Sequence, residues 1–214
     1  MIVNEELKKE NQAKSQKDLF VNRVAQIAQE QGWHKGIMPQ VCRDLGLTEE
    51  YYLIWFEQGI ISILRYLEDV YDQEMLQILA SLPKPTSITQ QIAQALKIRI
   101  CGTSRTKTLA QKNSAYYLKN LHITDLASFA WQSVDLVWQQ AGDLSLDYNY
   151  YSKRALLHGI YLAAQIRYNT DQSDDNIATK EFIDKSLHQL VGTIKRIKQV
   201  PNVLKKIPFL RIFI

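Results

Sequence analysis

The side chains that most often carry out catalysis are present in this sequence, but they are scattered along it. They are His34, His122, His158 and His188 together with Cys42 and Cys101. A metal centre or a nucleophilic site needs such groups at short fixed spacings or beside paired carboxylates, and none of them has such a neighbour. We therefore expect a protein that is not an enzyme, with no catalytic residue, no metal ligand and no cofactor. Both cysteines are expected to be free thiols.

Two short polar segments imitate ligand-binding motifs. Residues 102–108, GTSRTKT, hold a glycine, a lysine and threonines, but Arg105-Thr106 stands where a phosphate-binding loop requires a second glycine directly before the Lys-Thr pair. Residues 171–175 resemble the start of a calcium-binding loop. Asn176 replaces the required glycine there, and Phe182 replaces the closing glutamate. The first segment is therefore predicted to be a loop or helix end, and the second a capping segment.

Charge divides the chain into a mildly acidic body and a basic end. Residues 185–214 contain seven Lys or Arg and no Asp or Glu, whereas residues 1–184 contain 19 basic and 22 acidic side chains. No stretch reaches the roughly 18 uninterrupted apolar residues that span a bilayer, so any membrane contact should be peripheral. The first residues lack the pattern of a secretory or transit peptide, which predicts a cytoplasmic start or prior trimming.

The elements that position these residues are predicted to be helices. The chain has only five prolines and eight glycines in 214 residues, and it is rich in residues that favour helices. Apolar residues at helical spacing, with glycine, proline and capping residues between them, predict an all-α fold. The expected helices cover residues 17–31, a short helix ending at Gly46, one starting at Glu49, and residues 60–82, 87–100, 124–141 and 147–168, followed by a last helix.

Residues 20–60 have the order of elements found in a helix-turn-helix, which makes a ligand-responsive transcription regulator the alternative function. The helix that would read DNA begins with Glu49 and Glu50, and residues 48–56 contain no Lys or Arg. DNA affinity depends on neutralising phosphates with basic side chains. We therefore expect no nucleic-acid partner.

One segment carries a dense pattern of polar and aromatic residues. It reads A-G-D-x-S-x-D-x-N-Tyr-Tyr-x-x-Arg, then a helix, then Asp-x-Ser and Thr-x-x-Phe-Ile-Asp. The residues are Ala141, Gly142, Asp143, Ser145, Asp147, Asn149, Tyr150, Tyr151, Arg154, Asp171, Ser173, Thr179, Phe182 and Asp184. In this pattern the chain resembles the Coq-nine family of ubiquinone-biosynthesis accessory proteins. Asp135 with Trp138, and Gly32 with Trp33, also fit that family. The family usually has tryptophan where this chain has Tyr150.

The resemblance implies a TetR-like helical bundle that forms a homodimer and binds an isoprenoid quinone or a phospholipid. It also implies a partner, the di-iron demethoxyubiquinone hydroxylase, and a place on the inner membrane, on the matrix side if the source is eukaryotic. The expected organisation is a flexible N-terminus (1–16), a helix-turn-helix-like subdomain (17–59), a lipid-binding and dimerisation core (60–200) and a basic apolar tail (201–214).

Two sets of residues are assigned to these partners. A surplus of apolar side chains on two consecutive helices, together with the resemblance, predicts a lipid pocket lined by Ala127, Trp131, Val134, Trp138, Ile160, Tyr161 and Ala164. Tyrosine and arginine are common at binding hot spots. The predicted contact with the hydroxylase comprises Asp147, Asn149, Tyr150, Tyr151 and Arg154. The alternative is that Asp143, Asp147 and Arg154 cap helices and fix the corner between them.

The last residues, NVLKKIPFLRIFI, are too apolar for a free solvated terminus and too short and proline-broken to span a bilayer. Apolar side chains next to basic ones favour an anionic membrane surface. The predicted membrane contacts are Lys205, Lys206, Phe209, Leu210, Arg211 and Phe213. The alternative is that this tail packs on the dimer partner.

Overall fold

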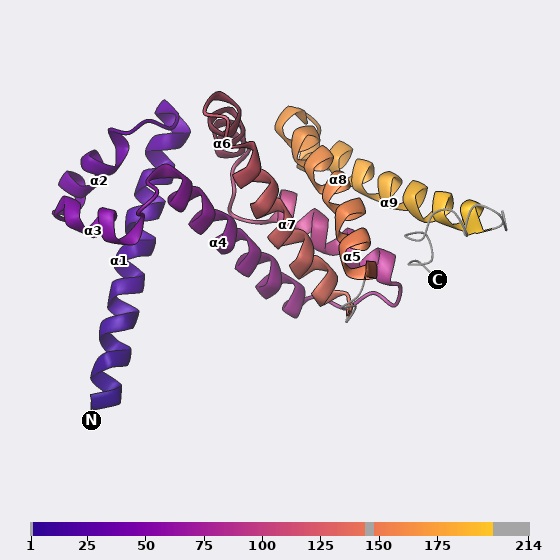
Figure 1. Cartoon of the computed structure of the whole chain (residues 1–214), viewed down its shortest axis with the longest axis horizontal. Helices are drawn as coiled ribbons and strands as arrows, with labels where there is room; N and C mark the ends of the chain where they lie inside the picture. The colour runs from indigo at the N-terminus through magenta and orange to yellow at the C-terminus, as the bar shows by residue number, and fades with distance from the viewer. Residues whose placement is uncertain (1, 144–147, 199–214) are drawn as a thin grey trace. The chain divides into compact units, whose positions relative to one another are not determined.

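A computed structural model describes the backbone of residues 2–143 and 148–198 and the side chains of residues 13–143 and 150–192. No strand occurs in these ranges, so the predicted all-α class is confirmed. Figure 1 shows the helices in chain order. They are α1 (Ile2–Gln31), α2 (Ile37–Leu45), α3 (Glu49–Trp55), α4 (Ile60–Ser81), α5 (Ile88–Lys97), α6 (Lys107–Lys119), α7 (Ile123–Gln140), α8 (Tyr148–Thr170) and α9 (Ile177–Lys198).

The start of α1 differs from the prediction. A helix beginning near Lys17, preceded by a flexible segment 1–16, was expected, whereas α1 begins at Ile2. The residues from Glu5 to Lys17 are mostly Glu, Lys, Gln and Ala, which have high helix propensity. The absence of an apolar stripe suggested a frayed start, but helix propensity alone favours a helix here.

Four predicted helix boundaries are confirmed. Gly32 and Gly46 end α1 and α2 with backbone φ angles of 80° and 65°, in the left-handed region that glycine adopts without strain. Thr48 occupies the N-cap position of α3 with an extended backbone, although its side chain makes no capping hydrogen bond. After Ser81 the helix α4 stops, as the prolines that follow require.

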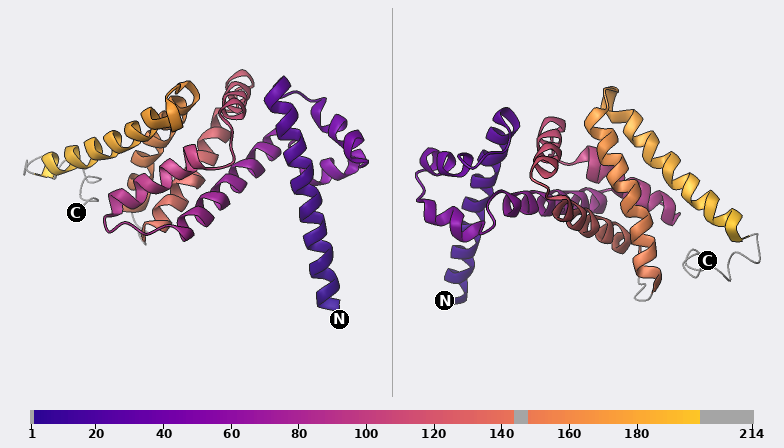
Figure 2. Two further views of the ribbon diagram at one scale, coloured as in Figure 1. Left: turned by 180° about the vertical axis from the view of Figure 1, so that it is seen from behind. Right: turned by 45° about the horizontal axis from the view of Figure 1, so that its top comes forward.

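The chain forms two compact units, of which unit 1 comprises Met1–Asp69 and Thr108–Asp125. Its core lies between α1, α2 and α3, which are seen side by side in both views of Figure 2. The completely buried Phe20 ring lies 5.9 Å from the ring of Phe56 and 6.1 Å from that of Trp55. These aromatic contacts hold the helix-turn-helix-like part of unit 1 together.

Unit 2 comprises Val70–Lys107 and Leu126–Ile214. In it α8 packs against α9 after a tight turn, and α9 also packs against α5. A π-helical turn, η1 (Ile98–Gly102), continues α5, and a short 3-10 turn, η2 (Asp174–Asn176), precedes α9. The first boundary between the units falls inside α4, after Asp69, and not after residue 59 as predicted, because α4 is one continuous helix.

Helix α6 was not predicted. Its sequence, KTLAQKNSAYYLK, has a weak apolar stripe, and its start coincides with the polar segment that was interpreted as a loop. Its buried residues, Leu109, Ala110, Asn113 and Tyr117, are not all apolar. Periodicity in hydrophobic residues is the main signal for a helix, and here that signal is diluted by a buried amide and a buried phenol.

Candidate functional site

The corner between α7 and α8 is organised around one buried arginine. Arg154 is 1% exposed, and its Nε donates to Asp135 Oδ1 at 2.5 Å while its Nη1 donates to Asp143 Oδ2 at 3.0 Å. The same Nη1 also donates to the Tyr150 carbonyl oxygen at 3.2 Å. A buried guanidinium is stable only where carboxylates and hydrogen bonds compensate its lost hydration, and this corner supplies both.

The backbone at the end of α7 places one of those carboxylates. Gly142 has φ 84°, and its amide donates to the Gln139 carbonyl while the Asp143 amide donates to the Trp138 carbonyl. This is a Schellman ending of a helix, which requires a left-handed residue at the glycine position. It turns the chain so that Asp143 faces Arg154, and Lys153 adds a second ion pair with Asp143 at 2.8 Å.

Two tyrosines cover this corner in different ways. The Tyr150 ring lies 3.5 Å from the guanidinium carbon of Arg154 and 5.1 Å from the Tyr151 ring. Burial raises the pKa of Tyr150, and so does the hydrogen bond to Asp135, with Arg154 acting in the opposite direction. Tyr151, by contrast, is 62% exposed. Tyr150 therefore belongs to the internal cluster, and Tyr151 is the aromatic side chain that a partner could reach.

The burial of Arg154 favours the alternative interpretation of this residue, and its direct contact with a partner stays a prediction. Its guanidinium is enclosed by Asp135, Asp143 and Tyr150, so it fixes the corner, as the alternative interpretation proposed. Spacing along the sequence could place Arg154 one helical turn from Tyr150 but could not show burial. The assignment of Asp147 and of the Asn149 side chain to the same contact lies outside the described residues, and the Tyr150 and Tyr151 assignments remain predictions.

A group of hydrogen bonds around the buried Asp171 accounts for the Asp-x-Ser and threonine positions of the pattern. Asp171 accepts hydrogen bonds from the Ser173 amide at 2.8 Å and hydroxyl at 2.6 Å, and from the Thr179 amide at 2.7 Å and hydroxyl at 2.5 Å. Burial would raise the pKa of Asp171, but these four hydrogen bonds outweigh it and hold the pKa well below its usual range. The predicted capping role of this segment is confirmed, because both carboxylate oxygens are engaged within the chain.

The residues of the predicted lipid pocket fall into two groups. Val134, Trp138, Tyr161 and Ala164 are buried in unit 2, whereas Ala127, Trp131 and Ile160 are half-exposed. His158 contacts two of the half-exposed residues. Its Nε2 lies 3.1 Å from the Ala127 carbonyl oxygen, and its ring lies 5.9 Å from that of Trp131. Ala127 and Trp131 on α7 are thus near His158 on α8, and whether they line a pocket remains a prediction.

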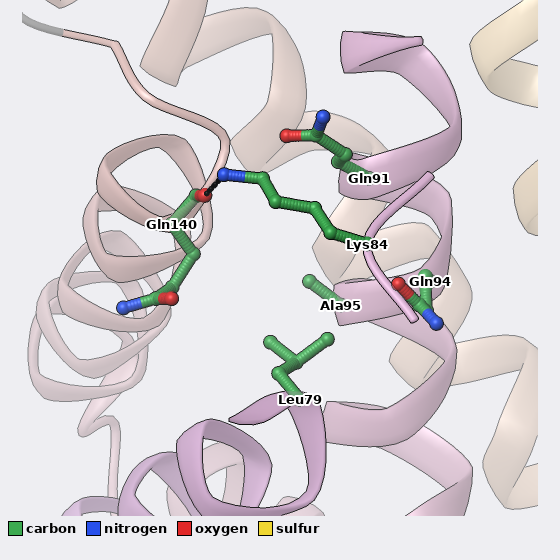
Figure 3. A pocket seen from close by; sticks show the side chains of 6 residues that line it. All are labelled: Leu79, Lys84, Gln91, Gln94, Ala95 and Gln140. Atoms are coloured by element: carbon green, nitrogen blue, oxygen red, sulfur yellow. Dashed lines mark hydrogen bonds between the residues drawn. The ribbon is translucent and has the colours of Figure 1, made fainter. Parts of the chain in front are cut away.

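Unit 2 contains a small cavity away from these residues. Its volume is about 70 Å³, and Figure 3 shows its lining, which is Leu79, Lys84, Gln91, Gln94, Ala95 and Gln140. Lys84 Nζ donates to the Gln140 carbonyl oxygen at 3.2 Å across the cavity. Ligand pockets usually begin at about 300 Å³ and are mainly apolar. This cavity is too small and too polar to hold an isoprenoid tail, and none of the seven predicted lining residues contributes to it.

Sequence reasoning missed a buried ion pair in the core of unit 2. Arg99 is completely buried, its Nε donates to Asp72 Oδ1 at 2.5 Å, and Ser133 Oγ donates to the same oxygen at 2.8 Å. Arg99 Nη2 also donates to Ser133 Oγ at 3.2 Å. These residues come from α4, η1 and α7, and no local motif relates them. An arginine within the otherwise apolar run at residues 98–101 was the only available signal.

Helix α3 of the helix-turn-helix-like part does not resemble the recognition helix of a DNA-binding protein. Helix α3 has the sequence EEYYLIW, and Leu53 and Ile54 are 57% and 74% exposed. Its first turn carries Glu49 and Glu50, and a carboxylate at this position stabilises the helix dipole but repels phosphate. The absence of a nucleic-acid partner remains a prediction.

Two further features concern membranes and metals. No helix among the described residues is long and apolar enough to cross a bilayer. In the same residues no group of three or more His, Cys, Asp or Glu side chains could hold a metal ion. The predicted membrane contacts Lys205, Lys206, Phe209, Leu210, Arg211 and Phe213 lie outside the described residues.

The fold is that of TetR-family regulators. The crystal structure of the TetR transcriptional regulator from Nitrosomonas europaea matches with a TM-score of 0.63 over 82% of this chain and 97% of that chain, at 16% identity. Identity this low shows a shared fold and nothing about ligands. The TetR-like fold implied by the resemblance is confirmed.

The sequence comparisons find similarity to one family, which is the family that the sequence pattern resembles. Residues 123–193, which include α7, α8 and the corner around Arg154, match the family model described as COQ9. The mitochondrial ubiquinone biosynthesis protein COQ9 of Rattus norvegicus is 22% identical over 190 residues, or 86% of this chain and 61% of the rat protein. The probable coq9 protein of Dictyostelium discoideum is 39% identical over 62 residues, or 29% of this chain and 20% of that protein. The predicted resemblance is confirmed, although the chain spans less than two thirds of these relatives.

Proposed function

We propose that this chain is a non-enzymatic accessory protein of ubiquinone biosynthesis that binds an isoprenoid quinone precursor and presents it at a membrane. The observation that carries the proposal is the COQ9 match over residues 123–193. The polar residues of the matched segment form two groups of hydrogen bonds, one around Arg154 and one around Asp171. Because the relatives in this comparison are named as mitochondrial proteins, the proposed location is the matrix face of the inner membrane, or the equivalent bacterial face.

The proposed lipid site lies along the half-exposed part of α7 and α8. Trp131 presents a large apolar ring beside His158, and Ala127 and Ile160 provide apolar surface that is not fully packed. The buried members Val134, Tyr161 and Ala164 lie in the core of the same unit. The cavity lined by Leu79, Lys84 and Gln140 includes none of these residues, so the proposed lipid site lies along α7 and α8 and not in that cavity.

Lipid extraction from the purified protein followed by mass spectrometry tests this proposal. We expect a quinone or phospholipid to co-purify with the protein. Trp131→Gln should lower quinone uptake at least about tenfold, since the ring of tryptophan buries more apolar area than any other side chain. Ile177→Gln, at a residue that is 50% exposed, is the matched control and should leave uptake unchanged. Absence of lipid in the extract together with absence of uptake would exclude the function.

The proposed contact with the demethoxyubiquinone hydroxylase centres on Tyr151. Its ring is exposed beside a rigid, buried ion-pair cluster, and a preorganised aromatic side chain is a common binding hot spot. Tyr151→Ala should weaken the association at least about tenfold without lowering stability. Tyr51→Ala on α3, where the tyrosine is 42% exposed, is the matched control. Equal affinities of the two variants would exclude Tyr151 from the interface.

The proposed role of residues 201–214 is to bind an anionic membrane surface. Three basic side chains among several apolar ones suit such a surface, and each basic group contributes about 1 kcal/mol. Truncation after Val200 should abolish flotation with anionic vesicles and leave the oligomeric state unchanged. Loss of a dimer on truncation would show instead that the tail packs on a second copy of the chain.

A further inference from the structure

The turn between α6 and α7 in unit 1 exposes an unusual concentration of apolar side chains. Leu118, Leu121 and Ile123 are 63%, 82% and 47% exposed, and they lie within six consecutive residues. Single exposed leucines are normal on protein surfaces, but clustered ones mark contact sites. We call these three residues, together with Trp33, Lys35 and Lys119, the α6–α7 turn surface.

The backbone at Leu121 makes this exposure more informative. Leu121 has φ 58°, its amide donates to the Leu118 carbonyl, and the His122 amide donates to the Tyr117 carbonyl. This is a Schellman ending in which leucine occupies the position that glycine or asparagine normally takes. A bulky residue there is strained, and its side chain gains no burial in return. Glycine or asparagine would serve the fold better, so stability does not explain leucine at this position.

Aromatic side chains border the exposed leucines. Trp33 Nε1 donates to Asn113 Oδ1 at 2.8 Å, and the Trp33 ring lies 6.3 Å from that of Tyr116. The Tyr116 ring in turn stacks on His122 at 5.9 Å. Trp33, Tyr116 and His122 are all half-exposed, so each has an apolar body and a polar edge available to solvent. Such rings prefer the boundary between water and lipid headgroups.

The two chain segments that form this surface carry basic side chains and no acidic ones. Residues 31–36 and 112–124 contain Lys35, Lys112 and Lys119 and no Asp or Glu. The carboxylates that flank these segments are Glu30, directly before the first, and Asp125, which lies 2.9 Å from His122 Nδ1. The segments lie side by side, since the Trp33 hydrogen bond joins one to the other. Exposed leucines with lysines around them and aromatic rings at their edge match the chemistry of an anionic membrane surface.

We infer that the α6–α7 turn surface is a peripheral membrane contact in which Leu118, Leu121 and Ile123 enter the headgroup region of an anionic bilayer. Apart from Ile123, which begins the COQ9-matched segment, the residues of this contact lie outside that segment, and all of them are separate in sequence from the basic tail. It extends the proposed function without depending on it, because binding to vesicles requires no quinone. A second membrane contact would restrict how the protein can be oriented on the bilayer.

Sedimentation of the full chain with vesicles made of equimolar phosphatidylcholine and phosphatidylglycerol tests the inference. The double variant Leu118→Gln, Leu121→Asn should bind at least about tenfold more weakly, because two apolar side chains no longer leave water. Asparagine tolerates the left-handed backbone at position 121, so the fold should be preserved. Ile166→Gln, at a residue that is 69% exposed, is the matched control and should bind like the wild type. The tail is intact in all of these proteins.

A second variant separates charge from apolar insertion. Lys35→Gln combined with Lys119→Gln should weaken binding by roughly fivefold for each lysine and reduce its dependence on salt. Vesicle binding by the leucine variant equal to that of Ile166→Gln would overturn the inference. If the leucine variant also lost binding to a protein partner, the surface would be a protein interface and not a membrane contact. Quinone uptake in detergent micelles, where no bilayer is present, tests the proposed function separately.

Discussion

Asp135 and Arg154 are 19 residues apart in sequence, and they join α7 to α8 through a hydrogen-bonded ion pair of 2.5 Å between Oδ1 and Nε. Arg154 is buried, and removing one partner of a buried pair leaves the other charge uncompensated. Arg154→Met should therefore lower the free energy of unfolding by about 3–5 kcal/mol, measured by urea denaturation. Arg23→Met, which breaks the exposed pair with Asp44, should cost less than about 1 kcal/mol. A similar small loss for Arg154→Met would show that the corner is not structural.

Asp171 gives the fold a dependence on acidic pH. Its pKa is held below the ordinary value, so its contribution to stability is complete above the pKa of the unfolded chain, about 3.9, and is lost as pH falls through the lower folded pKa. Asp171→Asn should cost about 2 kcal/mol near neutral pH, because the hydrogen bonds to a charged acceptor are lost. That difference should shrink below about pH 4. Asp184→Asn, which removes a half-exposed surface pair with Lys97, is the control. A difference independent of pH would contradict this role.

Leu121 should be a site where a small residue stabilises the protein. Leu121→Gly removes the strain of a left-handed leucine, which is worth about 1 kcal/mol, and should raise the melting temperature. The reverse change at an equivalent helix end, Gly46→Ala, should destabilise by a similar amount. An added Cβ at Gly46 meets no atom within 4 Å, so only backbone strain would act there. If both substitutions destabilised the protein, Leu121 would have a packing role that its exposure does not suggest.

Cys101 should react slowly with alkylating agents. Burial raises the pKa of its thiol to about 11, with Lys180 and Arg105 acting against this increase. The thiolate is the reactive form, so alkylation by iodoacetamide near pH 8 should be roughly a hundredfold slower than for an unperturbed cysteine. Mass spectrometry after timed alkylation measures this, with the urea-unfolded protein as the fast reference. Rapid modification of Cys101 in the folded protein would contradict the burial.

Local sequence determined much of this protein. The ends of α1 and α2 at Gly32 and Gly46 follow from the glycine preference for a left-handed backbone. The capping role of Asp171 follows from its spacing to Ser173, since that interaction spans only two residues. The resemblance to the COQ9 family was available too, because it rests on the order of residues in one continuous segment, and the TetR-like fold was expected from that resemblance.

Tertiary structure decided the rest, because it depends on contacts between distant residues. No spacing rule shows that Arg154 is buried or that Arg99 meets Asp72, since burial is a property of how several helices pack. Helix α6 was hidden for the same reason, because its buried Asn113 accepts a hydrogen bond from Trp33, which is 80 residues away. Leu121 appears in sequence as an ordinary apolar residue. Only the fold gives it a left-handed backbone and leaves its side chain in solvent.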